Sequence, residues 1–252
     1  MGLFSKKTCS VCGGDIGLLG NRKLEDGNLC KKCAAKLSPW FNERRQSTVE
    51  QIRAQLQYRE ENKAAVAAFH TTRSMGDNMK LLVDEDARKF VVSNARDLVA
   101  DNPDVLDFSM VTGVDLDIDE DRDEVKTEDK EGKSISYNPP RFDYSYDFHV
   151  VIRVNHPYFN EIRFRLNSSD VQVTTMPVPA VRRPNPRMNQ EYVKYEKMGQ
   201  EIVELLTQRR QQIRDEVKAA AAPKTAKICP SCGASSIPDV QGRCEYCGSF
   251  MG

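Results

Sequence analysis

The sequence predicts an α+β protein built from several small domains, not one large globule. Four cysteines in closely spaced pairs lie near each end of the 252-residue chain, and the middle alternates apolar and polar residues over several short runs. A long run without proline precedes the second cysteine set. Charged residues make up 29% of the chain, somewhat above the usual fraction of about 25%, which favours small modules joined by exposed linkers.

The first 37 residues contain the first cysteine set: Cys9, Cys12, Cys30 and Cys33. A turn-rich stretch with a hairpin around 24–29 separates the two pairs. The residues after Cys33, Ala34 to Leu37, have helix-forming character. This order of a cysteine turn, a hairpin and a pair that opens a helix predicts a treble-clef-like module over 1–37.

The last 26 residues contain the second set: Cys229, Cys232, Cys244 and Cys247. Glycine follows the second cysteine of both pairs, as Gly13 follows Cys12 in the first set, where a chain turning back past a metal needs a positive φ. Turn-forming residues around 238–242 separate the pairs. These features predict a zinc ribbon over 227–252.

Each set supplies four thiolates, which is the complete ligand shell of a structural Zn²⁺ site. A closed Cys₄ shell leaves no position for a reactive water, so both sites are expected to be structural, with one Zn²⁺ each. Iron also accepts four thiolates in a tetrahedron and stays open as the competing metal. Disulfides and a redox pair fit less well, because the N-terminus lacks the apolar core of a signal peptide and no βαβ pattern surrounds the cysteines.

Residues 38–75 are expected to form a connecting helix. Ser38-Pro39 reads as an N-cap followed by proline, and Ser47 to Glu50 offers a second start with capping-box spacing. Apolar residues then recur at helical spacing, and the helix is expected to end near His70.

Residues 76–218 are expected to form the β-rich domain. A hairpin is predicted from strands at 80–83 and 89–92, and further strands are predicted at 105–108, 111–118, 144–154 and 161–166. A long helix over 189–218 has one apolar stripe: Tyr192, Tyr195, Met198, Ile202, Leu205, Leu206, Ile213 and Val217. A curved antiparallel sheet or partly open barrel closed by one helix predicts a pleckstrin-homology-like arrangement.

Two segments are expected to be connectors. A proline-spaced stretch over 176–187 joins the strands to the long helix, and an Ala/Pro linker over 219–226 leads to the ribbon.

The N-terminal pattern also supports a resemblance. The stretch from Cys9 to Gly13, the residues Gly17-Leu18-Leu19, and the run from Leu24 to Cys33 resemble a family of short bacterial domains of unknown function. The resemblance covers about the first forty residues. It implies a bacterial zinc-binding protein in which a β-rich, pleckstrin-homology-like region follows the cysteine module, and it supplies no activity.

The acidic segment from Asp115 to Glu131 does not fit a calcium loop, since Glu120 stands at the glycine position and Lys126 at that of the bidentate carboxylate. A solvated strand face that runs into a disordered loop over 121–133 is expected instead. A cation site or a docking site for a basic partner stays open as the alternative.

The sequence contains no recognisable nucleophile motif, phosphate loop or pair of catalytic carboxylates. His70, His149 and His156 are dispersed, and roles in sheet packing and turns are expected for them. We therefore expect no enzyme.

The leading hypothesis is a cytoplasmic zinc-binding adaptor that presents surfaces to a protein partner, with peripheral membrane contact open. Lys+Arg and Asp+Glu both number 37, so no global field attracts nucleic acid. The N-terminal module is nevertheless locally basic, and nucleic-acid binding through Lys23, Lys31, Lys32 and Lys36 is the alternative. No stretch of the sequence has the length and apolarity of a transmembrane segment.

Overall fold

The computed structural model describes residues 7–173, 182–221, 226–239 and 241–251. It divides into two units, residues 1–210 and 211–252, and each is considered by itself. Half of the expected connector over 176–187 and half of the linker over 219–226 lie outside the described residues.

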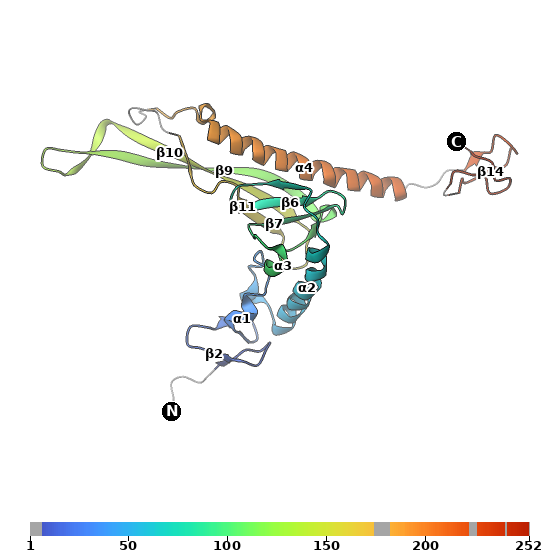
Figure 1. Ribbon diagram of the computed structural model, residues 1–252, viewed down its shortest axis with the longest axis horizontal. Helices are drawn as coiled ribbons and strands as arrows, with labels where there is room; N and C mark the ends of the chain where they lie inside the picture. Colours follow the sequence, from blue (N-terminus) through green and yellow to red (C-terminus); the bar gives the residue numbers. More distant parts are fainter. Residues whose placement is uncertain (1–6, 174–181, 222–225, 240, 252) are drawn as a thin grey trace. The chain divides into compact units, whose positions relative to one another are not determined.

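The N-terminal module of the first unit consists of two small hairpins and one helical turn (Figure 1). Its elements are β1 (Lys7–Thr8), β2 (Asp15–Ile16), β3 (Arg22–Lys23), β4 (Asn28–Leu29) and α1 (Lys31–Ala34). The second hairpin and the helix opened by the second cysteine pair confirm the predicted order of elements, but α1 ends at Ala34, so the helix expected to continue to Leu37 is wrong.

Helix α2 (Val49–Ala68) follows a short 3₁₀ turn at Arg44–Gln46. The capping box uses Thr48 and Gln51, one residue later than expected: the Thr48 hydroxyl accepts from the Gln51 amide, and the Gln51 side chain accepts from the Thr48 amide. The predicted helix start at Ser38-Pro39 is wrong, because the Ser38 hydroxyl accepts from the Trp40 amide in a tight turn and donates to Asp104.

The central strands form two hydrogen-bonded sheets. The first is a meander of β5 (Arg73–Met75), β6 (Lys80–Asp84), β7 (Lys89–Ser93) and β8 (Leu106–Asp107). The predicted hairpin of β6 and β7 is confirmed. Residues 73–75 pair with β6, so the connecting segment 38–75 is helical only over α2 and its 3₁₀ turn. A helical turn, α3 (Leu98–Asp101), and a 3₁₀ turn at Phe108–Met110 flank β8.

In the second sheet β10 pairs with all three other strands, namely β9, β11 and β12. The bounds are β9 (Val111–Glu128), β10 (Ser134–Val154), β11 (Glu161–Arg165) and β12 (Val171–Val173). The disordered loop expected over 121–133 is wrong. Pairing between β9 and β10 continues out to Glu128 and Ser134 (Figure 1). The backbone of residues 121–128 was expected to hydrogen-bond to water, but β10 supplies its hydrogen-bond partners.

The two faces of this sheet differ in polarity. Even-numbered residues of β10 from Tyr144 to Val154 are buried, as the alternation predicts. Asp115, Asp117 and Asp119 of β9 lie on the other face, where Arg153 and Arg163 form cross-strand ion pairs with them. Two arginines therefore pair with the three aspartates at the start of the acidic segment, within the sheet.

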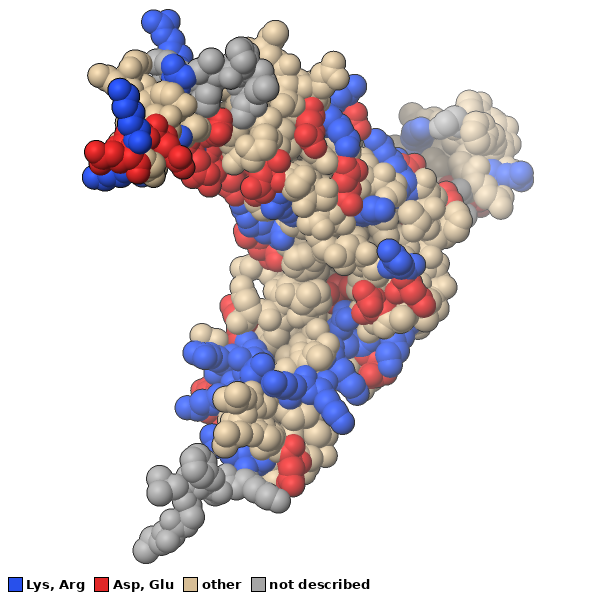
Figure 2. Space-filling view, turned by 60° about the vertical axis from the view of Figure 1, so that its left-hand side comes forward, with Lys and Arg blue, Asp and Glu red and all other residues tan. Residues whose placement is uncertain are grey.

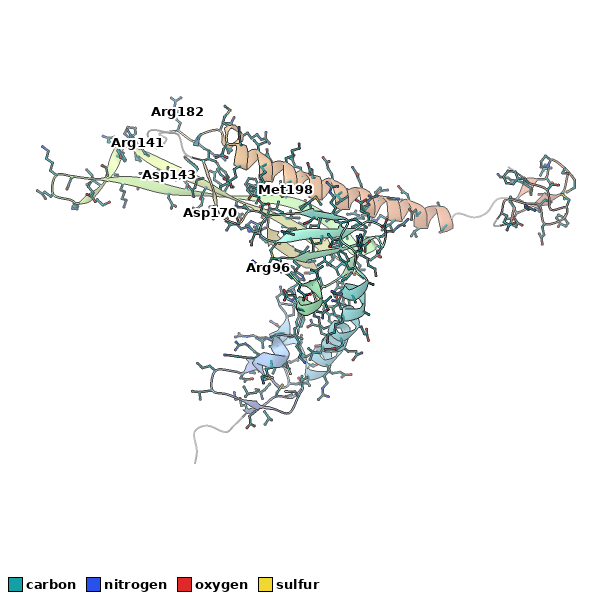
Figure 3. All side chains as sticks on the ribbon, viewed as in Figure 1. Arg96, Arg141, Asp143, Asp170, Arg182 and Met198 are labelled. Carbon is teal, nitrogen blue, oxygen red and sulfur yellow. The ribbon has the colours of Figure 1, made fainter. Side chains whose placement is uncertain are left out.

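Helix α4 (Gln190–Ala221) begins after a 3₁₀ turn at Pro186–Met188 and covers the apolar face. Tyr192 contacts Tyr146 and Phe148, with ring centroids 4.9 and 5.0 Å apart. Met198, labelled in Figure 3, is half-buried on the same helix. The predicted stripe is buried only as far as Leu206: Ile213 is partly exposed and Val217 is 63% exposed.

The second unit contains the end of α4 and the C-terminal ribbon, with β13 (Lys227–Ile228) paired to β14 (Ser235–Ser236). A single bridge between Arg243 and Phe250 completes its pairing among the described residues. The ribbon core consists of Cys229, Cys244 and Met251.

Candidate metal centres

Three of the four cysteine pairs adopt the same turn. The amides of Gly13, Gly233 and Gly248 each donate to the carbonyl of the first cysteine of their pair, at 2.8 to 2.9 Å. These glycines have φ of 70 to 72°. The left-handed conformation is one that side chains disfavour, so glycine at these positions allows the chain to reverse behind both thiols.

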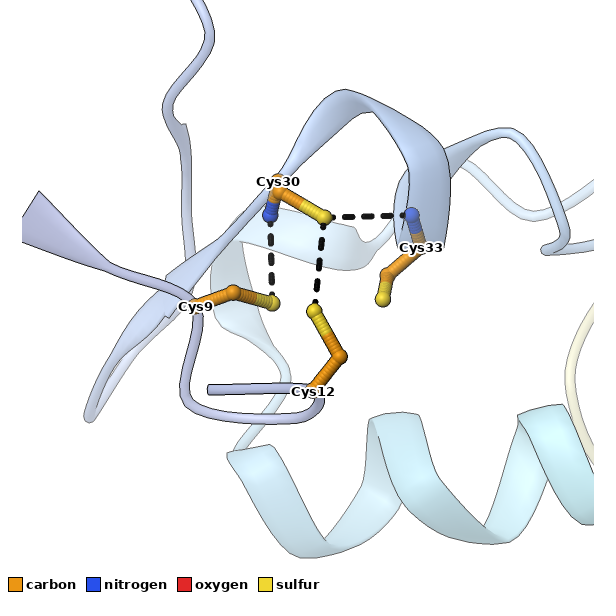
Figure 4. Close-up of side chains that lie close together, drawn as sticks. All are labelled: Cys9, Cys12, Cys30 and Cys33. Atoms are coloured by element: carbon orange, nitrogen blue, oxygen red, sulfur yellow. Dashed lines mark hydrogen bonds between the residues drawn. The ribbon is translucent and has the colours of Figure 1, made fainter. Parts of the chain in front are cut away.

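The fourth pair, Cys30 and Cys33, is built on a helix. Cys30 is the N-cap of α1, and its Sγ accepts a hydrogen bond from the Cys33 amide at 3.4 Å (Figure 4). The Cys30 amide in turn donates to Cys9 Sγ at 3.3 Å. Amide donors of this kind stabilise thiolates, which are the metal-binding form of cysteine.

The structure brings the eight cysteines together as two separate groups. Within each group, every sulfur lies within 4.8 Å of the others. The groups are Cys9, Cys12, Cys30 and Cys33, and Cys229, Cys232, Cys244 and Cys247. Among the described residues, these are the groups of His, Cys, Asp or Glu that can hold a metal ion.

The sulfur spacing fits a tetrahedral ion. A Zn–S bond of about 2.3 Å places neighbouring sulfurs of a tetrahedron about 3.8 Å apart. Cys12 and Cys30 are 3.8 Å apart, Cys229 and Cys247 are 3.6 Å apart, and Cys232 and Cys244 are 3.7 Å apart. A disulfide requires about 2.05 Å, and all eight cysteines are free thiols here.

The local electrostatics prepare selected thiols for ionisation. Burial opposes the Cys9 thiolate, but amides of Cys12, Cys30 and Val11 outweigh it and lower the Cys9 pKa to about 6. The Ser236 hydroxyl, 3.6 Å from Cys244 Sγ, is the main group that lowers the pKa of Cys244 to about 6. Burial and the neighbouring thiols raise the pKa of Cys33. In the first group Cys9 therefore ionises most readily, and ionisation of Cys33 beside it would require a cation.

Nothing in the sequence pattern marks Ser236 for this role. A hydroxyl near a thiolate has no spacing signature of its own, because its approach to Cys244 depends on the pairing of β13 with β14.

The module of the first cysteine group is attached to α2 by polar contacts between residues far apart in the sequence. Arg53 donates to the Ser10 carbonyl at 2.9 Å, and Asp26 accepts from the Val49 amide at 2.8 Å. Ile52 of α2 is buried in the same apolar cluster as Leu24 and Leu29. The module thus has a core of its own in addition to its cysteines.

Of the other candidate residues, Lys31 and Lys32 lie between Cys30 and Cys33, while the histidines lie outside both cysteine groups. Lys23, Lys31, Lys32 and Lys36 are all exposed. His149 Nδ1 lies 3.1 Å from the Asp119 carboxylate, and burial together with the Arg163 charge lowers its pKa. The ring of His156 packs among Tyr58, Tyr158 and Phe159.

Comparison with known proteins is informative for the N-terminal module. A family model described as a domain of unknown function, DUF4428, matches residues 8–55, which include the first cysteine group and the start of α2. No curated protein and no solved structure matches the chain. Among the described residues, no helix combines the length and apolarity needed to cross a membrane.

Proposed function

We propose that the protein is a zinc-binding adaptor in which each cysteine group holds one structural Zn²⁺. The donor set supports this proposal, since four sulfurs at tetrahedral spacing complete the shell of the ion and leave no position for a reacting water. Iron would use the same ligands. The role of the ion in either group is to hold a small fold together.

The C-terminal ribbon is the surface that we propose for a protein partner. Tyr246 and Phe250 are 70% and 69% exposed, and Ile228 is 74% exposed. Residues 227–252 contain two basic and two acidic side chains, so electrostatic attraction does not dominate. Exposed aromatic and aliphatic side chains on a neutral module are typical of protein interfaces.

The finer organisation belongs to the same proposal. Residues 1–37 would form a treble-clef-like module, 76–218 a pleckstrin-homology-like domain, and 227–252 a zinc ribbon, with connectors at 38–75 and 219–226. One long helix along the apolar face of an antiparallel sheet supports the central assignment. A bacterial origin and a cytoplasmic location are part of this proposal, as is the absence of an enzymatic activity.

The experiment combines metal analysis with partner capture. Full-length protein purified under reducing conditions should contain two zinc ions per chain by elemental analysis, and Cys244→Ser should lower this to one. Tyr246→Ser with Ile228→Ser should retain both ions and lose the captured proteins. Met188→Ser, at a side chain that is 83% exposed outside the ribbon, is the control.

Two outcomes would contradict the adaptor proposal. One is an unchanged set of captured proteins in the ribbon variant. The other is a captured set that disappears with nuclease, which would favour nucleic-acid binding through the four lysines of the N-terminal module.

A further inference from the structure

The loop between β2 and β3 exposes two leucines at its tip. The Gly20 amide donates to the Gly17 carbonyl at 2.8 Å, which closes a tight turn with Leu18 and Leu19 at its two corners. These side chains are 83% and 82% exposed. Turn corners usually carry Gly, Pro, Asn, Asp or Ser, so two adjacent leucines here are not explained by turn chemistry.

The core of the module does not explain the leucines either. The apolar cluster around the first cysteine group uses Leu24, Leu29 and Leu37, with Ile16 packed against it from the base of the same loop. Leu18 and Leu19 take no part in that cluster. Keeping both in water forfeits the free energy that burial of two leucines would release.

Basic side chains lie beside this tip. Leu18, Leu19, Lys31 and Lys32 line one open hollow of about 590 Å³, together with Cys12, Cys30 and a single acidic residue, Asp15. The Arg22 guanidinium lies 3.5 Å from the Leu19 carbonyl, at the base of the turn. Figure 2 shows Lys and Arg gathered in its lower half, where the N-terminal module lies. Residues 7–37 contain six basic and three acidic side chains.

We propose that this loop docks the N-terminal module on an anionic lipid bilayer. Leu18 and Leu19 enter the acyl boundary, while Lys31, Lys32 and Arg22 face the headgroup phosphates. A short apolar tip ringed by cations fits a bilayer, because the membrane interface presents negative charge directly above an apolar layer. This surface is separate from the ribbon and goes beyond the adaptor function proposed above.

The leucines favour a bilayer over nucleic acid. The lysines suit phosphates of either source, and they also offset the negative charge that four thiolates leave around a divalent ion. A nucleic-acid backbone offers no apolar layer for an exposed leucine pair, and single-stranded bases are held by aromatic side chains. The double-leucine variant therefore separates the two ligands.

The test is vesicle co-sedimentation of the full-length, zinc-loaded protein. Vesicles of phosphatidylcholine with phosphatidylserine are compared with phosphatidylcholine alone. Leu18→Asn with Leu19→Asn keeps the turn and should weaken binding to the anionic vesicles at least about tenfold. Lys31→Gln with Lys32→Gln should weaken it by about fivefold for each lysine. Met188→Ser, with an equally exposed side chain, should bind as the wild type does.

The leucine variant must retain two zinc ions per chain, which shows that the module is folded. Binding that is equal with and without phosphatidylserine would overturn the proposal, as would a leucine variant that binds like the wild type. Binding to a DNA duplex that depends on Lys31 and Lys32 but not on the leucines, without vesicle binding, would assign the surface to nucleic acid. None of these vesicle or DNA results tests partner capture by the C-terminal ribbon, which the Tyr246→Ser and Ile228→Ser variant tests independently.

Discussion

A buried ion pair connects the N-terminal module, α2 and the segment before β8. The Asp104 side chain is 0% exposed and that of Arg59 is 8% exposed, with 2.7 Å between Asp104 Oδ1 and Arg59 Nη1. Asp104 also accepts from the hydroxyls of Ser38 and Tyr58, at 2.7 and 3.0 Å. Arg59 donates further to the Lys36 carbonyl at 3.2 Å. One carboxylate therefore satisfies three donors from two parts of the chain.

Removing this carboxylate should be costly. Asp104→Ala leaves the buried Arg59 guanidinium without its counter-charge, and breaking a buried pair in this way costs about 3 to 5 kcal/mol. A typical domain has about 5 to 15 kcal/mol of total stability, so this is a large fraction. Asp104→Asn should cost less, about 1.5 to 3 kcal/mol, because its carbonyl still accepts from Arg59 and Tyr58.

Urea denaturation followed by tryptophan fluorescence measures these free energies. Trp40 is the single tryptophan of the chain, and its amide donates to Ser38 within this network. The double variant Arg59→Met with Asp104→Leu should cost less than the sum of its single variants by at least about 2 kcal/mol, since it removes both charges together. A cost below about 1 kcal/mol for Asp104→Ala, or strict additivity in the double variant, would refute the reasoning.

Three other perturbations have expected outcomes. Gly199→Ala should destabilise the first unit, because its Cβ would lie 2.3 Å from Leu116 Cδ1. In a Leu116→Ala background the same change should instead stabilise the helix by about 0.5 to 1 kcal/mol. Urea denaturation distinguishes the loss of unfolding free energy from the gain. Zinc removal by a chelator should abolish amide protection in the ribbon, whose core is Cys229, Cys244 and Met251, before protection is lost around Ile52 in the larger N-terminal cluster; simultaneous loss by hydrogen exchange would contradict this order. Burial lowers the pKa of His156 below its value in the unfolded chain, so the unfolded state binds the proton more readily. The free energy of unfolding should therefore fall as the pH drops below about 6.5. His156→Gln should reduce that fall, and a variant with the same pH profile as the wild type would exclude His156 as its source.

Local sequence signals predicted the features that depend on local chemistry. The glycine after a Cys-x-x-Cys pair specifies the reversal seen at Gly13, Gly233 and Gly248, and alternation in 144–154 identifies the buried face of β10. Both patterns are complete within a few residues, so tertiary contacts had little scope to override them.

Features that depend on distant partners were not predicted. Arg59 and Asp104 are 45 residues apart, and each alone reads as a solvated charge. The charges over 121–133 likewise read as disorder, yet pairing with β10 holds residues 121–128 in a strand, where Arg122 also lies 4.5 Å from the centroid of the Phe142 ring. In both cases the sequence near the charged residue does not identify its distant partner.

The long two-stranded arm formed by β9 and β10 should open more easily at its outer end than at its base. Near its base, β12 and β11 pair with residues 144–146 and 149–153 of β10, whereas the outer residues 134–136 and 141–143 pair with β9 alone. Figure 3 shows Arg141 and Asp143 on this outer part. The amides of the outer part are held by one neighbouring strand, so they should exchange with deuterium before the amides of β10 near the base do. The arm can therefore fray and re-form repeatedly while the sheet beneath α4 stays closed.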